Sequence, residues 1–134
     1  MPTDSLYRIS LKCLIKNEMG QVLVVKEAGR TSWDLPGGGM DHGENIASAI
    51  ARELKEEIGL VGAFSYSIIG LDEPVRLTTR DIWQIRIIFE VRPEQMTFQP
   101  GKDSDEIAFM NPEILVPSIQ QSLEKSWSHL AIDL

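Results

Sequence analysis

Three glutamates lie close together in the middle of the chain, at Glu53, Glu56 and Glu57. If this segment is helical, residues three and four positions apart share one face, so the three carboxylates meet. Like charges on a helix face cost ~0.2–0.5 kcal/mol per pair, and anions near a helix C-terminus oppose the helix dipole. A divalent cation among them would remove that cost, and such hard oxygen ligands suit Mg²⁺ or Mn²⁺. The alternative interpretation is an ordinary solvated acidic helix face.

The residues around the glutamates predict the helix that would carry them, over Asn45–Ile58. Asn45 is a favourable N-cap, and Gly59 can adopt the left-handed conformation that ends a helix. Apolar residues recur at every fourth position and predict the buried face: Ile46, Ile50, Leu54 and Ile58. Since the acidic face adjoins this stripe, we expect the carboxylates at the edge of the core.

A glycine-rich segment precedes the predicted helix. Gly37, Gly38 and Gly39 predict an irregular loop that runs to about Gly43. Glycine allows backbone carbonyl groups to approach a metal ion closely, and the helix would deliver carboxylates to the same place. By itself the segment is equally typical of a tight turn, and it matches neither the dinucleotide-binding nor the P-loop spacing.

The rest of the chain predicts an α+β fold in a single domain over residues 1–134. Asn17–Gly20 predicts a hairpin turn, and the short connections favour antiparallel pairing. A proline at position 117 could begin a closing helix that runs to about His129. The predicted order is β-β-β-α-β-β-β-α, with strands at Tyr7–Ile15, Gln21–Lys26, Trp33–Leu35, Phe64–Leu71, Trp83–Val91 and Ile107–Met110.

Composition limits the class of protein. The chain has 134 residues with 43% hydrophobic and 25% charged residues, which is typical of a globular domain and not of a disordered one. Its net charge of −7 disfavours polymeric nucleic acid and anionic membranes as partners. No apolar run reaches the ~18 residues of a membrane span, and no N-terminal signal is evident. With Cys13 as the single cysteine, expected to be buried, we predict a cytoplasmic protein.

A longer pattern contains both the glycines and the glutamates. Gly38, Glu44 and the segment Arg52–Leu60 resemble the Nudix hydrolase signature, G-x5-E-x7-R-E-U-x-E-E-x-G-U with U aliphatic, at every fixed position. The resemblance implies an α/β/α sandwich around a central mixed sheet, with the signature as loop, helix and loop. It also implies hydrolysis of a nucleoside diphosphate linked to another moiety, with Mg²⁺ or Mn²⁺ as cofactor.

The resemblance also implies roles for individual residues. Glu53, Glu56 and Glu57 occupy the family's metal-ligand positions, and the carbonyl group of Gly37 resembles a further ligand. We expect Glu53 and Glu56 to be catalytic.

Other signature positions resemble structural ones. Glu44 and Arg52 are expected to pair and to hold the loop against the helix, while Gly38 and Gly59 are expected to shape its two ends.

The base that activates water is less well defined. In such proteins it comes from the signature itself or from a later loop, and Glu106 is our choice outside the signature, with Asp105 as the second choice. A solvated loop acid is an equally good interpretation of Glu106.

Three cations are expected to bind substrate near the site, Lys26, Arg30 and Arg86. An arginine in the middle of a strand needs either an acidic partner or a substrate anion. For Lys26 and Arg30 the ordinary alternative is a solvated surface charge.

Three functions compete at this stage. The first is a metal-dependent pyrophosphohydrolase acting on a nucleoside triphosphate or another small nucleotide. The second is a catalytically silent module that binds a nucleotide as a sensor or partner-binding domain, and the third is an acidic domain that binds a cation for stability. The sequence leaves open whether the protein is a monomer or a homodimer.

Overall fold

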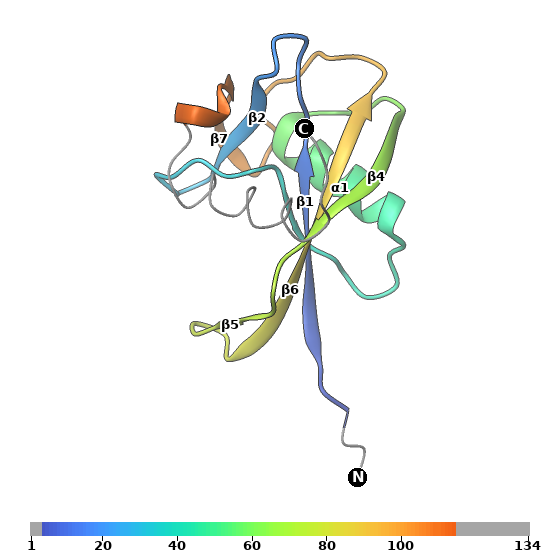
Figure 1. Cartoon of the computed structure of the whole chain (residues 1–134), viewed down its shortest axis with the longest axis vertical. Helices are drawn as coiled ribbons and strands as arrows, with labels where there is room; N and C mark the ends of the chain where they lie inside the picture. The colour runs from blue at the N-terminus through green and yellow to red at the C-terminus, as the bar shows by residue number, and fades with distance from the viewer. Residues whose placement is uncertain (1–3, 115–134) are drawn as a thin grey trace.

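The computed structural model of the chain describes residues 4–114 (Figure 1). The predicted closing helix lies outside the described residues. Within them the order is β-β-β-α-β-β-β-β followed by a short 3-10 turn, with one strand more than predicted. The elements are β1 (Tyr7–Leu14), β2 (Val22–Glu27), β3 (Gly37–Gly39), α1 (Ile46–Ile58), β4 (Phe64–Leu71), β5 (Val75–Leu77), β6 (Ile82–Pro93), β7 (Ser104–Met110) and η1 (Pro112–Ile114).

The main sheet has five strands in the order β3-β1-β6-β4, with β5 also pairing with β6. Strands β1 and β6 run parallel, and the other pairs in this sheet are antiparallel. This is the mixed sheet that the resemblance implied. The tight turns predicted antiparallel pairs only, because they say nothing about strands as distant in the chain as β1 and β6.

Strand β2 leaves the main sheet after the hairpin turn. It shares only the isolated bridge Lys16–Val22 with the preceding hairpin arm, and it pairs along its length with β7 in a separate two-stranded sheet. The register of this pair shifts between Lys26 and Glu27, so Glu27 lies opposite Ser104. The small sheet therefore brings the loop before β7 close to the signature helix, where Asp103 N–H donates to the Glu56 carbonyl oxygen (2.9 Å).

Helix α1 forms as predicted. The Asn45 side chain accepts from the Ser48 N–H, and Ser48 returns the bond in a capping box. Gly59 ends the helix in the left-handed conformation at φ 69°. The fully buried stripe of the helix packs with Leu11 of β1 and Phe89 of β6 in one hydrophobic cluster.

Three local predictions differ from the structure. The glycines of 37–39 form strand β3 instead of a loop, because backbone pairing with β1 needs no side chains and satisfies polar groups of that strand. The predicted strand Trp33–Leu35 is reduced to an isolated bridge between Val25 and Asp34. The segment between the predicted strands Phe64–Leu71 and Trp83–Val91, where no strand was predicted, contains the short strand β5, which pairs with β6.

Cys13 is fully buried and free, as predicted. Among residues 4–114 there is no helix long and apolar enough to cross a membrane. The prediction that residues 1–134 form a single domain stays a prediction.

Candidate active site

The carboxylates of α1 line a hollow beside the glycines. Glu53 and Glu57 are buried, with exposed fractions of 8% and 3%, and Glu56 is partly buried. Together with the backbone of β3 they line a hollow of about 360 Å³. Because two of the three carboxylates are removed from water, the interpretation as a solvated helix face is wrong.

Burial makes the charged form of two glutamates unfavourable. Burial raises the pKa of Glu57 to about 8, against the hydrogen bond from the Gly37 N–H to Glu57 Oε2 (2.8 Å), which lowers it. Burial likewise raises the pKa of Glu53, opposed chiefly by the charge of Arg52. A cation bound between them would stabilise both carboxylates as anions.

Arg52 ties the glycine-rich segment to the helix. Its guanidinium donates to both carboxylate oxygens of Glu44, Nε to Oε2 (2.7 Å) and one terminal nitrogen to Oε1 (2.9 Å), and also to the Gly39 carbonyl oxygen (3.0 Å). These hydrogen bonds lower the pKa of Glu44 to about 2, with Arg52 as the main cause. The predicted contact between Glu44 and Arg52 is present.

The same guanidinium reaches two of the expected metal ligands. It donates to Glu53 Oε1 (3.0 Å) and to Glu56 Oε2 (3.4 Å). In residues 4–114 no three acidic, histidine or cysteine side chains are arranged as a metal centre. The oxygen donors fit a hard divalent cation by type, but the carboxylates would have to turn from Arg52 to enclose one.

Side chains at Gly37 and Gly38 would meet atoms of neighbouring elements. A Cβ atom on Gly38 would lie 2.8 Å from Glu53 Oε1, and one on Gly37, at φ 136°, would overlap the Leu11 carbonyl oxygen. The predicted structural importance of Gly38 thus has a steric basis.

A buried lysine lies behind β3. Lys12 is 7% exposed, and its ammonium donates to the carbonyl oxygens of Leu35 (3.2 Å) and Gly37 (3.3 Å) and lies 3.1 Å from Asp34 Oδ2. The Gly37 carbonyl, expected as a metal ligand, therefore accepts from Lys12. Lys12 was not predicted from the sequence, although the alternation of Arg8, Ser10 and Lys12 along a strand was a signal for a polar face.

The acids outside the helix are arranged differently from the prediction. Asp103 lines the hollow with the glutamates, whereas Glu106 and Asp105 do not. Glu106 lies opposite Lys26 on the small sheet, 3.4 Å from its ammonium, and Asp105 accepts from the Gly29 N–H (3.1 Å). The fold therefore places neither Glu106 nor Asp105, the two bases proposed from the sequence, beside the helix carboxylates. Asp103, which does lie there, was not predicted.

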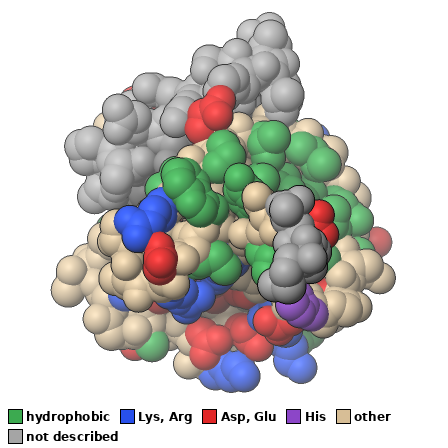
Figure 2. Space-filling model, turned by 90° about the horizontal axis from the view of Figure 1, so that it is seen from below, with side chains coloured by type: hydrophobic (Ala, Val, Ile, Leu, Met, Phe, Trp, Pro, Cys, Tyr) green, Lys and Arg blue, Asp and Glu red, His purple; other side chains and the backbone are tan. Residues whose placement is uncertain are grey.

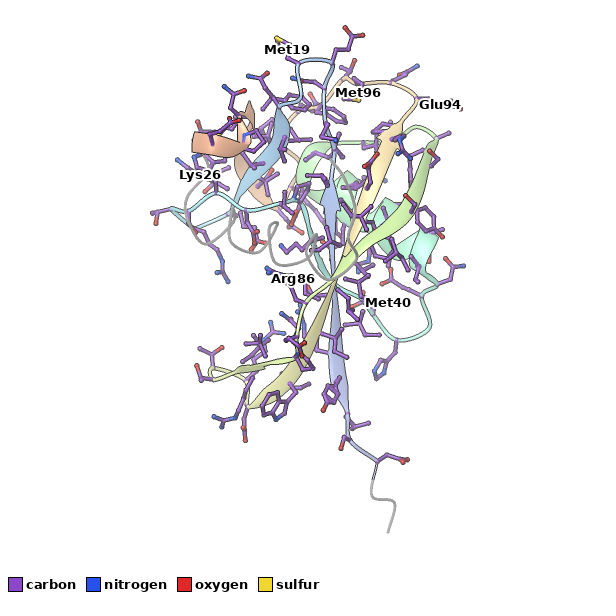
Figure 3. The ribbon with its side chains drawn as sticks, viewed as in Figure 1. Met19, Lys26, Met40, Arg86, Glu94 and Met96 are labelled. Carbon is purple, nitrogen blue, oxygen red and sulfur yellow. The ribbon has the colours of Figure 1, made fainter. Side chains whose placement is uncertain are left out.

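The expected substrate-binding cations divide into two groups. Arg30 and Arg86 line a second hollow of about 520 Å³, which shares Arg8, Glu27 and Gly38 with the first. Lys26 lines neither, and its ammonium lies 4.7 Å from the centre of the Trp33 ring. In Figure 3 Arg86 lies near the crossing of β1 and β6, and Lys26 lies to one side by β2.

Acidic and basic side chains are therefore neighbours at this end of the molecule. Figure 2 shows red and blue side chains together on the face that is seen from below in Figure 1. The acidic hollow lies over α1 and β3, and the basic one over β1 and β6. This combination can hold a cation and a polyanion side by side.

Comparison with known proteins identifies the family. The model of the NUDIX domain matches residues 6–129. The chain belongs to the NUDIX domain family, and the resemblance of its signature to that of Nudix hydrolases is confirmed.

Curated relatives match parts of the chain. An RNA pyrophosphohydrolase of Actinobacillus pleuropneumoniae serotype 5b (strain L20) is 50% identical over 54 residues, which are 40% of this chain and 26% of that protein. An 8-oxo-dGDP phosphatase of Mus musculus is 39% identical over 95 residues, which are 66% of this chain and 26% of that protein. The chain thus spans about a quarter of the length of these relatives.

Solved structures confirm the fold. The MutT protein from Methanosarcina mazei Go1 superposes with a TM-score of 0.76 at 23% identity, covering 98% of this chain and 100% of that one. A MutT NUDIX hydrolase from Burkholderia pseudomallei gives 0.72 at 16% identity, covering 90% and 98%. The predicted sandwich with a mixed sheet is correct.

Proposed function

We propose that the protein hydrolyses a pyrophosphate bond in a nucleoside diphosphate linked to another moiety, and that it does so at the acidic hollow. The observation that carries this proposal is the cluster of Glu53, Glu56 and Glu57, two of them buried, against the backbone of β3. Buried carboxylates that repel one another destabilise a fold unless a neighbouring cation stabilises their charged forms. The NUDIX family generally uses divalent metal ions.

In this proposal Glu53, Glu56 and Glu57 hold Mg²⁺ or Mn²⁺. The cation would neutralise phosphate oxygens and lower the pKa of the attacking water. Arg52 restrains two of these carboxylates and the Gly39 carbonyl, so it keeps helix and strand in register. Small residues in β3 leave room for the phosphate groups of the substrate.

An acid of the hollow accepts the proton of the attacking water. Asp103 lines the hollow from outside the signature, and Glu56 is the most accessible of the three helix glutamates. We assign the base to one of these two, and Glu106 stays a candidate from the sequence alone. Asp103→Asn and Glu106→Gln compare the two candidates outside the signature: loss of kcat with substrate binding intact in only the first variant supports Asp103 over Glu106.

The proposed substrate class is a small nucleotide. Relatives are named RNA pyrophosphohydrolase and 8-oxo-dGDP phosphatase, and both names describe nucleotide phosphate chemistry. A nucleoside triphosphate fits this class, whereas the net charge of −7 disfavours a polymeric RNA. We propose that the protein acts in the cytoplasm as a monomer or homodimer.

A nucleotide-binding module without activity is the second candidate. The contacts of Arg52 with Glu53 and Glu56 favour it, because a guanidinium there stabilises the carboxylates without a metal ion. In that case the chain binds a nucleotide and turns none over.

Turnover separates the two functions. Phosphate and pyrophosphate release is measured with Mg²⁺ and Mn²⁺ on normal and oxidised nucleoside triphosphates, ADP-ribose, nucleotide sugars and dinucleoside polyphosphates. We expect turnover of at least one nucleotide and a loss of about 100-fold or more in Glu56→Gln. Glu18→Gln, an exposed turn residue, is the matched control. Nucleotide binding with no turnover in any arm would support the silent module.

A further inference from the structure

The second hollow is strongly basic. Five cations line it, Arg8, Lys12, Arg30, Arg80 and Arg86, against two acids, Glu27 and Asp34. Its volume of about 520 Å³ lies within the ~300–1,000 Å³ typical of small-molecule sites. It has room for a sugar or nucleoside as well as an anion.

Most of these cations have acidic partners. Lys12 lies 3.1 Å from Asp34 Oδ2, and Arg30 lies 3.4 Å from Glu27 Oε2. Arg86 pairs with the buried carboxylate of Asp72. Within the described part of the chain, the two acids that line the hollow are therefore already engaged.

Arg8 and Arg80 differ from the others. Across residues 4–114 neither forms an ion pair, and Arg8 donates to the neutral side chain of Gln84. Burial and then the positive charge of Arg80 lower the pKa of the partly buried Arg8, while the charges of Glu53 and Glu27 raise it, and Arg80 itself is exposed. Two like charges that repel each other thus line one hollow. Repelling guanidiniums at one hollow are stabilised when an anion binds between them.

The fold holds this pair beside the acidic hollow. Arg8 lies opposite Gln84 in the parallel pairing of β1 with β6, and it lines both hollows. Arg80 stands in the turn between β5 and β6, where its N–H donates to the Leu77 carbonyl oxygen (3.3 Å). The Arg8 guanidinium thus comes from strand β1 of the main sheet, and the Arg80 guanidinium comes from the turn between β5 and β6.

We propose that Arg8 and Arg80 bind a phosphate group of the substrate other than the pyrophosphate that is cleaved at the glutamates. Guanidinium groups bind phosphate oxygens in pairs of parallel hydrogen bonds. The substrate then carries an additional phosphate, either in a longer 5′ chain or as an ester on the attached moiety. This inference rests on the proposed function for the position of the scissile bond, but its binding test needs no turnover.

The test is calorimetric binding with EDTA present, so that hydrolysis does not interfere. The probes are AMP, ADP, ATP and adenosine 3′,5′-bisphosphate, and the last is an isomer of ADP with one phosphate moved to the ribose. The variants are Arg80→Gln and Arg8→Gln, with Arg92→Gln, an exposed arginine at the far end of β6, as control. Thermal midpoints equal to that of the wild type show that each variant is folded.

We expect the wild type to bind one of the phosphate-extended probes on the order of tenfold more tightly than its shorter counterpart. Arg80→Gln abolishes this advantage, while Arg92→Gln retains it. Loss of the ATP advantage over ADP identifies a longer chain, and loss of the bisphosphate advantage over AMP identifies an ester on the moiety. Absence of any advantage in the wild type, or its full retention in Arg80→Gln, would overturn the proposal whether or not the protein hydrolyses nucleotides.

Discussion

Arg52 binds both carboxylate oxygens of Glu44 across eight residues, with N–O distances of 2.7 and 2.9 Å. The pair joins the loop after β3 to the middle of α1, and the same guanidinium contacts the Gly39 carbonyl. It therefore fixes the spacing between the glycines and the glutamates.

Charge reversal tests the pair. Glu44→Arg should lower both the melting temperature and any activity, because it places two cations in contact at a partly buried position. Combining it with Arg52→Glu should restore part of both. Double-mutant-cycle measurements of the melting temperature report the coupling, and strictly additive effects would show that the contact does not stabilise the fold.

Acid should weaken the same pair. The hydrogen bonds from Arg52 hold the pKa of folded Glu44 at about 2, below its ordinary value of 4.5. A depressed pKa contributes stability that is present above the unfolded value and is lost as the pH falls from about 4.5 towards about 2. The urea midpoints of the wild type and Glu44→Gln should therefore differ at pH 6 and converge only as the pH approaches about 2. A gap that is independent of pH would contradict this account.

Replacing Gly37 should destabilise the protein more than replacing Gly29. Gly37→Ala should cost more than about 3 kcal/mol, because it combines the left-handed backbone with overlap on the Leu11 carbonyl. Gly29→Ala, at φ 80° with no neighbour within 4 Å, should cost only about 1–2 kcal/mol. Gly62→Ala, in open space, should be nearly neutral. Equal losses in urea unfolding for the first two variants would rule out close packing as the reason for Gly37.

Metal ions should stabilise the protein through the buried glutamates. At a Mg²⁺ or Mn²⁺ concentration of ~100 times its dissociation constant, the expected gain is about 2.7 kcal/mol in the free energy of unfolding. Glu57→Gln should lose most of this gain while keeping its acceptor for the Gly37 N–H. Thermal melts with and without metal measure this gain in stability. An unchanged gain in Glu57→Gln would show that the ion binds away from Glu57.

Local sequence patterns were sufficient to predict helix α1 and the positions of its glutamates. Capping residues bound α1, and the three-and-four spacing placed the glutamates on one face. Their burial follows from the apolar stripe beside them, and the contact of Glu44 with Arg52 followed from the signature.

The site residues that the sequence did not predict reach the site through strand pairing between distant parts of the chain. Asp103 and Glu27 reach the hollows because β2 pairs with β7 and shifts register at Glu27, which no local pattern encodes. Arg8 aligns with Gln84 only through the parallel pairing of β1 and β6. Three glycines in a row indicate a loop, yet here they form an edge strand through backbone hydrogen bonds alone.

We propose that the acidic hollow hydrolyses a pyrophosphate bond with a divalent cation. The most direct test is the initial rate of hydrolysis of the best nucleotide substrate as Mg²⁺ is titrated, for the wild type and Glu53→Gln. We expect no rate in EDTA, a saturable rise with Mg²⁺ in the wild type, and a rate at saturating metal lower by about 100-fold or more in the variant. An equal rate in EDTA, or a wild-type rate in Glu53→Gln, would contradict it.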